Sequence, residues 1–239
     1  MSREARRIEI FLPDEFRAIL TTAERELPEQ AAIVSVLALA GVRVGEALAL
    51  QVDDLDFRQA ELWVQRTWGR EHRALGNRQI GSPKSGEAGR VLMSQELARV
   101  LQAHVSLLQA EAAVAGQPTP IWLFPEPGRE TPMRPNYFYK RVWRPLLRRA
   151  AVRYRKPHTM RHTYASVLLA SGAPLTFVRD QLRHSSITIT ADVYGHLIPR
   201  AHRETLDAID QFARGRRGDR EPEPASSRDP VAAGLRVAP

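Results

Sequence analysis

Residues 156–186 read KPHTMRHTYASVLLASGAPLTFVRDQLRHSS. This segment predicts a strong helix that ends at Gly172, because glycine closes helices. A short helix is predicted next, from Pro174 to Leu182, because proline opens helices. A helical pattern also precedes the segment, from Asn136 to Ala151. The C-terminal half of the chain is therefore predicted to be mainly helical.

The N-terminal half combines helical patterns with a few strand-like ones. Helices are predicted at residues 12–25 (LPDEFRAILTTAER) and 28–40 (PEQAAIVSVLALA). Residues 61–68 (ELWVQRTW) are strand-like, and turn residues lead from them to RVLM, so we expect a small antiparallel sheet around residues 60–93. Helices and strands do not alternate, which disfavours a doubly wound fold. We expect an α+β fold that is mostly α-helical with a small antiparallel β-sheet.

The 239 residues, of which 43% are hydrophobic, suffice for a sizeable core. No run reaches the roughly 18 apolar residues of a membrane span, and no signal-peptide centre follows the charged start, so we expect a cytoplasmic protein without membrane contact. Cysteine is absent, which excludes disulfides, thiolate metal sites and a cysteine nucleophile. We expect the folded domain at residues 1–213 and a disordered basic, proline-rich tail at 214–239.

The charge indicates a polyanionic partner. The net charge is +8, and all but three of the 35 basic residues are Arg, whose rigid fork suits phosphate. No acid occurs between Glu130 and Asp180, a gap that holds eleven cations interleaved with aromatic residues. Phosphate backbones bind such surfaces, although a solvated helix face or a codon-biased genome gives the same pattern. The cations that we expect to bind double-stranded DNA are Arg134, Lys140, Arg141, Arg144, Arg148, Arg155 and Lys156.

The helix at residues 158–171 has two predicted faces, at about 100° per residue. The apolar face, which we expect to pack, holds Met160, Tyr164, Val167 and Leu168. The opposite face holds His158, Arg161, His162 and Ala165. His158 and Arg161 then sit one turn apart, where they either act on one small target or simply face solvent.

Tyr194 lies in a predicted helix that Thr190 can cap. Its hydroxyl, with an ordinary pKa near 10, is a nucleophile only where cations stabilise the phenolate or a base accepts the proton. Arg43, Arg161 and the imidazoles can supply this environment if folding brings them together. A lone tyrosine at helical spacing otherwise serves in packing.

Four separated segments are the most specific feature of the sequence. They are LALAGVRVGEALALQVDDLDF (37–57), SPKSGEAGRVL (82–92), residues 156–186 as quoted above, and ITADVYGHL (189–197). In this order they resemble the first arginine box, the lysine-bearing β-turn, the His-x-x-Arg box with its following histidine, and the nucleophile box of tyrosine recombinases of the phage integrase type. The likeness to that family's catalytic domain spans about residues 10–212.

The resemblance implies a reaction at a scissile phosphate of DNA. Arg43 and Arg161 would hold its non-bridging oxygens and stabilise the transition state. Tyr194 would attack the phosphorus, which gives a 3′-phosphotyrosyl link and a free 5′-hydroxyl. Cations of the protein would replace a metal ion, and the phosphotyrosine would conserve the bond energy, so neither a metal nor another cofactor is expected.

The remaining site residues follow from the same resemblance. Lys84 would protonate the leaving alkoxide, which arginine, with its pKa above about 12, could not readily do. His158 would assist proton transfer from the tyrosine and contact the phosphate, and His184 would hydrogen-bond the phosphate. Glu46 would brace the arginines or His158. His162 is expected only to support packing of its helix, and a metal site at His158 and His162 lacks a third ligand.

Two features depart from the family pattern. Arg183 stands where the family usually has a glycine, directly before His184, and its side chain either shifts His184 or adds a phosphate contact. The likeness also begins almost at Met1, without the N-terminal helical domain that completes a clamp around DNA. The chain is therefore either a shortened form or a recombinase that works with half a clamp.

The expected protein recombines DNA as a homotetramer on two duplexes and is a monomer in free solution. Three alternative functions are compatible with the same sequence features. An inactive or accessory DNA-binding module would keep the basic surface without turnover. A type IB topoisomerase would use similar chemistry alone, and a metal-dependent nuclease would need clustered carboxylates.

Overall fold

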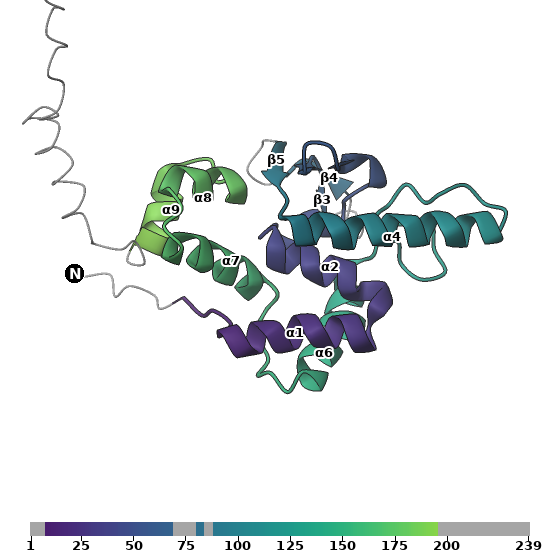
Figure 1. The fold of residues 1–239 in the computed structure, drawn as a ribbon, viewed down its shortest axis with the longest axis horizontal. Coiled ribbons are helices and arrows are strands. Elements are labelled where there is room, and N and C mark those ends of the chain that lie inside the picture. Colours follow the sequence, from purple (N-terminus) through teal and green to yellow (C-terminus); the bar gives the residue numbers. More distant parts are fainter. Residues whose placement is uncertain (1–7, 69–79, 84–87, 196–239) are drawn as a thin grey trace, which may run out of the picture. The chain divides into compact units, whose positions relative to one another are not determined.

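The computed structural model describes residues 8–68, 80–83 and 88–195, which all belong to the first of two compact units, Met1–Ile198 (Figure 1). Its helices are α1 (Pro13–Glu26), α2 (Pro28–Leu39), α3 (Val44–Ala47), the 3₁₀ turn η1 (Val52–Asp54), α4 (Gln95–Val114), α5 (Pro135–Tyr137), the π-helical η2 (Phe138–Trp143), α6 (Arg144–Arg149), α7 (His158–Ala170), α8 (Leu175–Leu182) and α9 (Ile187–Tyr194). Its strands are β1 (Leu55–Asp56), β2 (Glu61–Val64), β3 (Thr67–Trp68), β4 (Ile80–Gly81) and β5 (Gly89–Leu92).

Within the described residues, the strands form two small antiparallel sheets. In the larger one the order is β1-β2-β5, and β2 pairs with β5 from Glu61 opposite Leu92 to Val64 opposite Gly89. β3 and β4 form the smaller sheet. The predicted α+β fold, mostly helical with a small antiparallel sheet, is confirmed.

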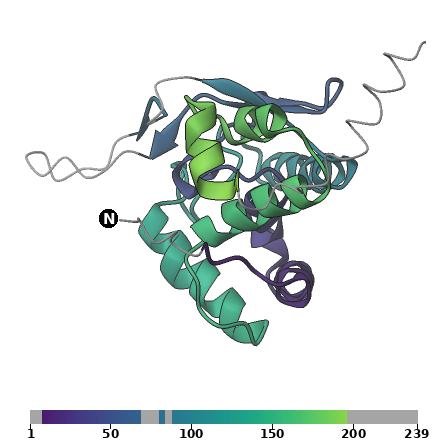
Figure 2. The ribbon, with the colours of Figure 1, turned by 90° about the vertical axis from the view of Figure 1, so that its left-hand side faces the viewer.

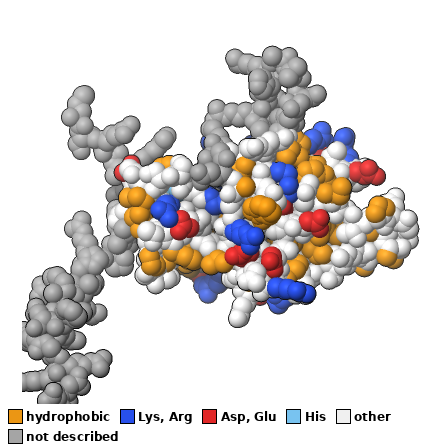
Figure 3. All heavy atoms as spheres, turned by 90° about the horizontal axis from the view of Figure 1, so that it is seen from above, with side chains coloured by type: hydrophobic (Ala, Val, Ile, Leu, Met, Phe, Trp, Pro, Cys, Tyr) orange, Lys and Arg blue, Asp and Glu red, His pale blue; other side chains and the backbone are white. Residues whose placement is uncertain are grey.

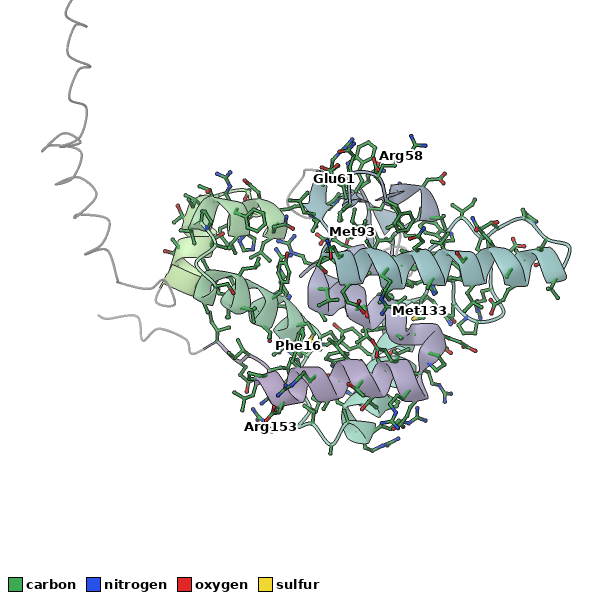
Figure 4. All side chains as sticks on the ribbon, in the orientation of Figure 1. Phe16, Arg58, Glu61, Met93, Met133 and Arg153 are labelled. Carbon is green, nitrogen blue, oxygen red and sulfur yellow. The ribbon has the colours of Figure 1, made fainter. Side chains whose placement is uncertain are left out.

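The main hydrophobic core surrounds α2. This helix is buried from Ala32 to Ala38 because α1, α4 and α7 all pack against it. The ring of Trp143 packs against the rings of both Phe11 and Phe138 in the same core. Phe16, Met93 and Met133, labelled in Figure 4, extend it.

A second, smaller core lies between α7, α8 and α9, which lie together in Figure 2. Its buried members are Ala165, Leu169, Val178, Leu182 and Tyr194. Tyr194 is 1% exposed, so the phenol ring is part of a core as well as part of the site described below.

The helix that carries Tyr194 begins one turn earlier than predicted. The Ser186 hydroxyl accepts a hydrogen bond from the backbone N–H of Thr188 (3.1 Å) and caps α9. The predicted cap, Thr190, lies inside the helix and is fully buried. Serine and threonine are both favoured at the start of a helix, so residue type alone does not distinguish Ser186 from Thr190 as the cap.

The predicted faces of α7 are wrong in part. Val167, expected in the apolar face, is 57% exposed, whereas Arg161 and Ala165 from the polar face are buried. The reason is that α7 is covered on two sides, by α2 and by α8 with α9. A helix in that position does not follow a single apolar stripe.

Gly41 shapes the turn between α2 and α3, and replacing it with alanine should destabilise the protein. Its φ is +61°, and a Cβ there would lie 2.4 Å from Cδ1 of Tyr164. Left-handed strain and overpacking together predict that Gly41→Ala lowers the free energy of unfolding by about 2–4 kcal/mol in a urea titration. Gly116→Ala is the matched control, since Gly116 has a φ of +62° with open space around it. Equal losses in both variants would contradict the predicted clash.

Candidate active site

Arg43 and Glu46 form the first part of the site, at the start of α3. The backbone N–H of Arg43 donates to Oε2 of Glu46 (2.9 Å), and its Nη1 donates to Oε1 (3.0 Å). Burial of Glu46, which is 1% exposed, opposes ionisation, but the charges of Arg183 and Arg43 outweigh it and lower the pKa of the carboxyl. Glu46 is therefore an ionised brace for Arg43, whose side chain stays 32% exposed.

Arg161 of α7 joins three segments. Its Nη1 donates to the carbonyl of Gly41 (2.8 Å), and its Nη2 donates to the carbonyl of Leu182 at the end of α8. The residue is 3% exposed. Burial and the neighbouring charge of Arg43 lower the pKa of Arg161 to about 9, so the guanidinium is still charged at neutral pH. Arg43 and Arg161 thus place two positive charges in one region.

His158 and His184 lie close to the two arginines. Loss of water around the ring, followed by the charges of His162 and Arg161, lowers the pKa of His158 to about 4. Burial and the charges of Arg161 and Arg43 lower the pKa of His184 to about 4 as well. Nδ1 of His184 lies 2.8 Å from the Thr190 hydroxyl. Both imidazoles are therefore neutral at pH 7 and can accept or donate hydrogen bonds.

These histidines predict a pH dependence of stability. A pKa lowered by folding means that the unfolded chain binds more protons than the folded chain between pH 4 and 6.5, so the free energy of unfolding should fall as the pH drops through this window. Urea titrations of the variant His158→Asn/His184→Asn should show a shallower slope. Some slope will remain, because burial also lowers the pKa of His104 and of His162. An unchanged slope would contradict the prediction.

His162 is the site residue that the sequence did not reveal. Its Nδ1 lies 2.7 Å from the hydroxyl of Tyr194, and its ring meets that of His158 edge to face at 4.7 Å between centroids. Burial raises the pKa of Tyr194 to about 12, and the charge of Arg161 opposes that shift. The i, i+4 spacing of His158 and His162 predicts that the two rings are neighbours on one helix face. No local sequence signal predicts the contact of His162 with Tyr194, which lies 32 residues further along the chain.

The structure brings together most of the predicted site. The residues whose contacts or charges meet in this region are Arg43, Glu46, His158, Arg161, His184 and Tyr194, joined by His162 and Arg183. Lys84 lies outside the described residues. Within residues 8–68, 80–83 and 88–195, no three His, Asp or Glu side chains are grouped to hold a metal ion.

The predicted DNA-binding cations differ in their surroundings. Lys140 and Arg141 line a hollow of about 210 Å³ together with Arg134, which also pairs with Glu126 (2.6 Å). Arg144 lies over the ring of Tyr154 (5.5 Å). Arg144, Arg148 and Lys156 are exposed.

Arg155, which is predicted to bind DNA, is largely enclosed by other side chains. Its side chain is 10% exposed, pairs with Glu15 (2.9 Å) and lies 5.0 Å from the ring of Phe11. The guanidinium therefore links the segment that follows α6 to α1 and to Phe11, which precedes α1. The charge pattern alone could not separate this arginine from its exposed neighbours.

A helical fold with cations gathered around one buried tyrosine defines a domain of the tyrosine recombinase class. The family model described as "Phage integrase family" matches residues 9–200, and the chain belongs to this family. This confirms the predicted resemblance. None of the described helices has the length and hydropathy of a membrane span.

Relatives of known structure or sequence agree with this assignment. The chain is 32% identical to a tyrosine recombinase XerC-like protein of Caldanaerobacter subterraneus, over 72% of this chain and 46% of the relative. It is 30% identical to an integrase/recombinase of Escherichia coli, over 87% of this chain and 66% of that protein. The crystal structure of XerA recombinase aligns with a TM-score of 0.62 and 26% identity, over 85% of this chain and 65% of the other. The chain thus spans less than two thirds of these relatives.

A solved DNA complex shares the fold. The Tn1549 transposon integrase in complex with transposon right end DNA aligns with a TM-score of 0.66 and 18% identity, over 90% of this chain and 69% of that one.

Proposed function

We propose that this chain is the catalytic domain of a site-specific DNA recombinase that cleaves and rejoins double-stranded DNA through a 3′-phosphotyrosyl intermediate. The convergence of Arg43 and Arg161 from separate elements on the surroundings of Tyr194 carries this proposal. Two fixed guanidiniums can hold a phosphodiester in place while a phenol attacks it.

In the proposed cleavage step, the Tyr194 oxygen forms a bond to phosphorus and the bond from phosphorus to the 5′-oxygen breaks. Arg43 and Arg161 neutralise the charge on the non-bridging oxygens, and His184 donates a hydrogen bond to one of them. Rejoining reverses the step, with a 5′-hydroxyl as the attacking group. No oxidant, metal or nucleotide takes part in this scheme.

The phenol needs a proton acceptor because its pKa of about 12 keeps it protonated. The Nδ1 atom of His162 lies within hydrogen-bond distance of the Tyr194 hydroxyl, and burial lowers the pKa of this imidazole. We therefore assign His162 as the group that first accepts the phenol proton. The ring of His158 adjoins that of His162. His158 would assist this proton transfer and would also contact the phosphate.

Lys84 is proposed as the acid that protonates the 5′-oxygen. Lys84→Ala should slow adduct formation about a hundredfold on an ordinary phosphodiester. It should slow the reaction much less on a 5′-bridging phosphorothiolate, because a thiolate leaves without a proton. Single-turnover rates on both substrates measure this difference, and equal losses would remove Lys84 from the role.

The proposed partner is double-stranded DNA, bound as a homotetramer, with a monomer in free solution. The Tn1549 integrase complex with DNA supports the choice of partner. The outer face of β2 and β5 is an unsuitable DNA surface, because Asp53, Asp56 and Glu61 line a hollow there and acidic and basic side chains mix on that side (Figure 3). We therefore assign DNA to the side with the arginines of the site.

We further propose the cytoplasm as the compartment, residues 1–213 as the domain and 214–239 as its tail.

The test is a covalent trap. The protein is incubated with a nicked DNA substrate in EDTA, and denaturing gels reveal protein bound to DNA. The proposal predicts an adduct that resists denaturation. Binding without an adduct would favour the inactive DNA-binding module, and cleavage that EDTA abolishes would favour a nuclease.

A further inference from the structure

Arg183 occupies an unusual place at the end of α8. Its backbone is left-handed, with φ 51° and ψ 51°. Helices commonly close in this conformation, usually with glycine, because a side chain is strained there. A strained residue persists where its surroundings hold it in place. The contacts of the Arg183 side chain should therefore explain its position.

The side chain of Arg183 connects α8 to two other elements. A Cβ placed on Gly89 would lie 2.9 Å from Cδ of Arg183, so the aliphatic stem lies directly on the first residue of β5. Its Nη2 forms an ion pair with Oε2 of Glu46 in α3. The side chain is 6% exposed, which makes this a buried link between α8, β5 and α3.

Glu46 is held from two sides. Its Oε1 accepts from the guanidinium of Arg43, and its Oε2 faces both the Arg43 backbone N–H and Arg183. A buried carboxylate that loses one of its cations binds a proton more readily. Protonated Glu46 would hold the Arg43 guanidinium less firmly.

The position of Arg183 distinguishes it from Arg43. The side chain of Arg43 is 32% exposed and that of Arg183 is 6% exposed, so a phosphate that enters from solvent reaches Arg43 first. Nε, Nη1 and Nη2 of Arg183 are buried without an aligned hydrogen bond to any residue that the structure describes. The charge of Glu46 is the compensation found there for this buried guanidinium.

We propose that Arg183 is a positioning residue: it clamps the Glu46 carboxylate from the side opposite Arg43 and so fixes the Arg43 guanidinium for the phosphate. This inference rests on the proposed function. Arg183 acts through Glu46 and does not touch the DNA. The charged and titratable groups that act on Glu46 or respond to it are Arg43, Arg161, Arg183 and His158.

The test is a double-mutant cycle read out by the rate of adduct formation from about pH 5 to 8. Its variants are Arg183→Gln, Glu46→Gln and the two combined. Arg183→Gln should slow the reaction about tenfold at pH 8 and more at pH 5, because Glu46 then protonates within this range. In the Glu46→Gln background, Arg183→Gln should have almost no further effect. The control Arg179→Gln, on the same helix but in an ion pair with Asp180, should match the wild type.

Two results would overturn the proposal. A loss that is equal at every pH and persists in the Glu46→Gln background would show that Arg183 contacts the phosphate directly. An unchanged rate in Arg183→Gln would deny it any role. Should Arg183→Gln fail to fold, Arg183→Gly, which removes the backbone strain, replaces it in the cycle.

A measurement without DNA separates this inference from the proposed function. The lowered pKa of Glu46 contributes stability above pH 4.5 that is lost as the pH falls through the folded-state value. The rise in the free energy of unfolding from about pH 3 to 5.5 should be smaller in Arg183→Gln than in the wild type, and Glu46→Gln should cancel this difference. Equal pH dependence in wild type and Arg183→Gln would refute the clamp, whereas a wild type without any adduct would refute only the proposed function.

Discussion

Tyr194→Phe should form no covalent adduct with DNA, because the phenylalanine ring has no oxygen to attack phosphorus. The ring of Tyr194 fills the core between α7, α8 and α9, and phenylalanine fills it equally well. Loss of the hydrogen bond to His162 should lower the free energy of unfolding by only about 0.5–1.5 kcal/mol. Gel shifts should therefore still show DNA binding, while denaturing gels show no adduct.

Tyr164→Phe is the matched control for this experiment. Tyr164 is a half-buried tyrosine of α7, and its hydroxyl donates to Oε1 of Gln181 (3.4 Å), which is not a partner of Tyr194. This variant should form the adduct at the wild-type rate. An adduct in Tyr194→Phe, or its loss in Tyr164→Phe, would assign the nucleophile to another residue.

Arg161→Ala should reduce both the reaction rate and the stability. Removal of one donor that stabilises transition-state charge slows such reactions about a hundredfold to a thousandfold. The carbonyls of Gly41 and Leu182 would also lose their buried donors, which lowers the free energy of unfolding by about 1–3 kcal/mol. Single-turnover rates and urea titrations measure the two effects.

Arg43→Ala separates these two effects. Its guanidinium is partly exposed and makes no bond to those carbonyls, so we expect a comparable loss of rate with a smaller loss of stability. A full rate in Arg161→Ala would contradict the proposed phosphate site. If Arg161→Ala regains the wild-type rate at a lower temperature, where the variant is more stable, then the role of Arg161 is structural only.

The architecture was largely predictable from local signals. Proline at Pro13 and Pro28 and glycine at Gly41 mark helix ends that the structure has. The π-helical segment at residues 138–143 has no such signal, and the two possible caps of α9 could not be ranked by propensity. The faces of α7 required knowledge of the helices on both of its sides.

The sequence predicted those candidate site residues that lie in the four family segments. It did not predict contacts between residues that are far apart in the sequence. Arg43, Arg161 and Tyr194 stood out through the family boxes. The bond between His162 and Tyr194 and the ion pair of Arg183 with Glu46 depend on how α8 and α9 pack. Charge density also gave no sign that Glu15 and Phe11 enclose Arg155, because these contacts depend on the fold.

The most direct test of the account identifies the bond in the trapped complex. The adduct is digested with protease and nuclease, and tandem mass spectrometry locates the attached nucleotide. The account predicts one modified residue, Tyr194, linked to the 3′-phosphate of a nucleotide, with a free 5′-hydroxyl on the other strand end. A nucleotide on any other residue, or a link through a 5′-phosphate, would contradict it.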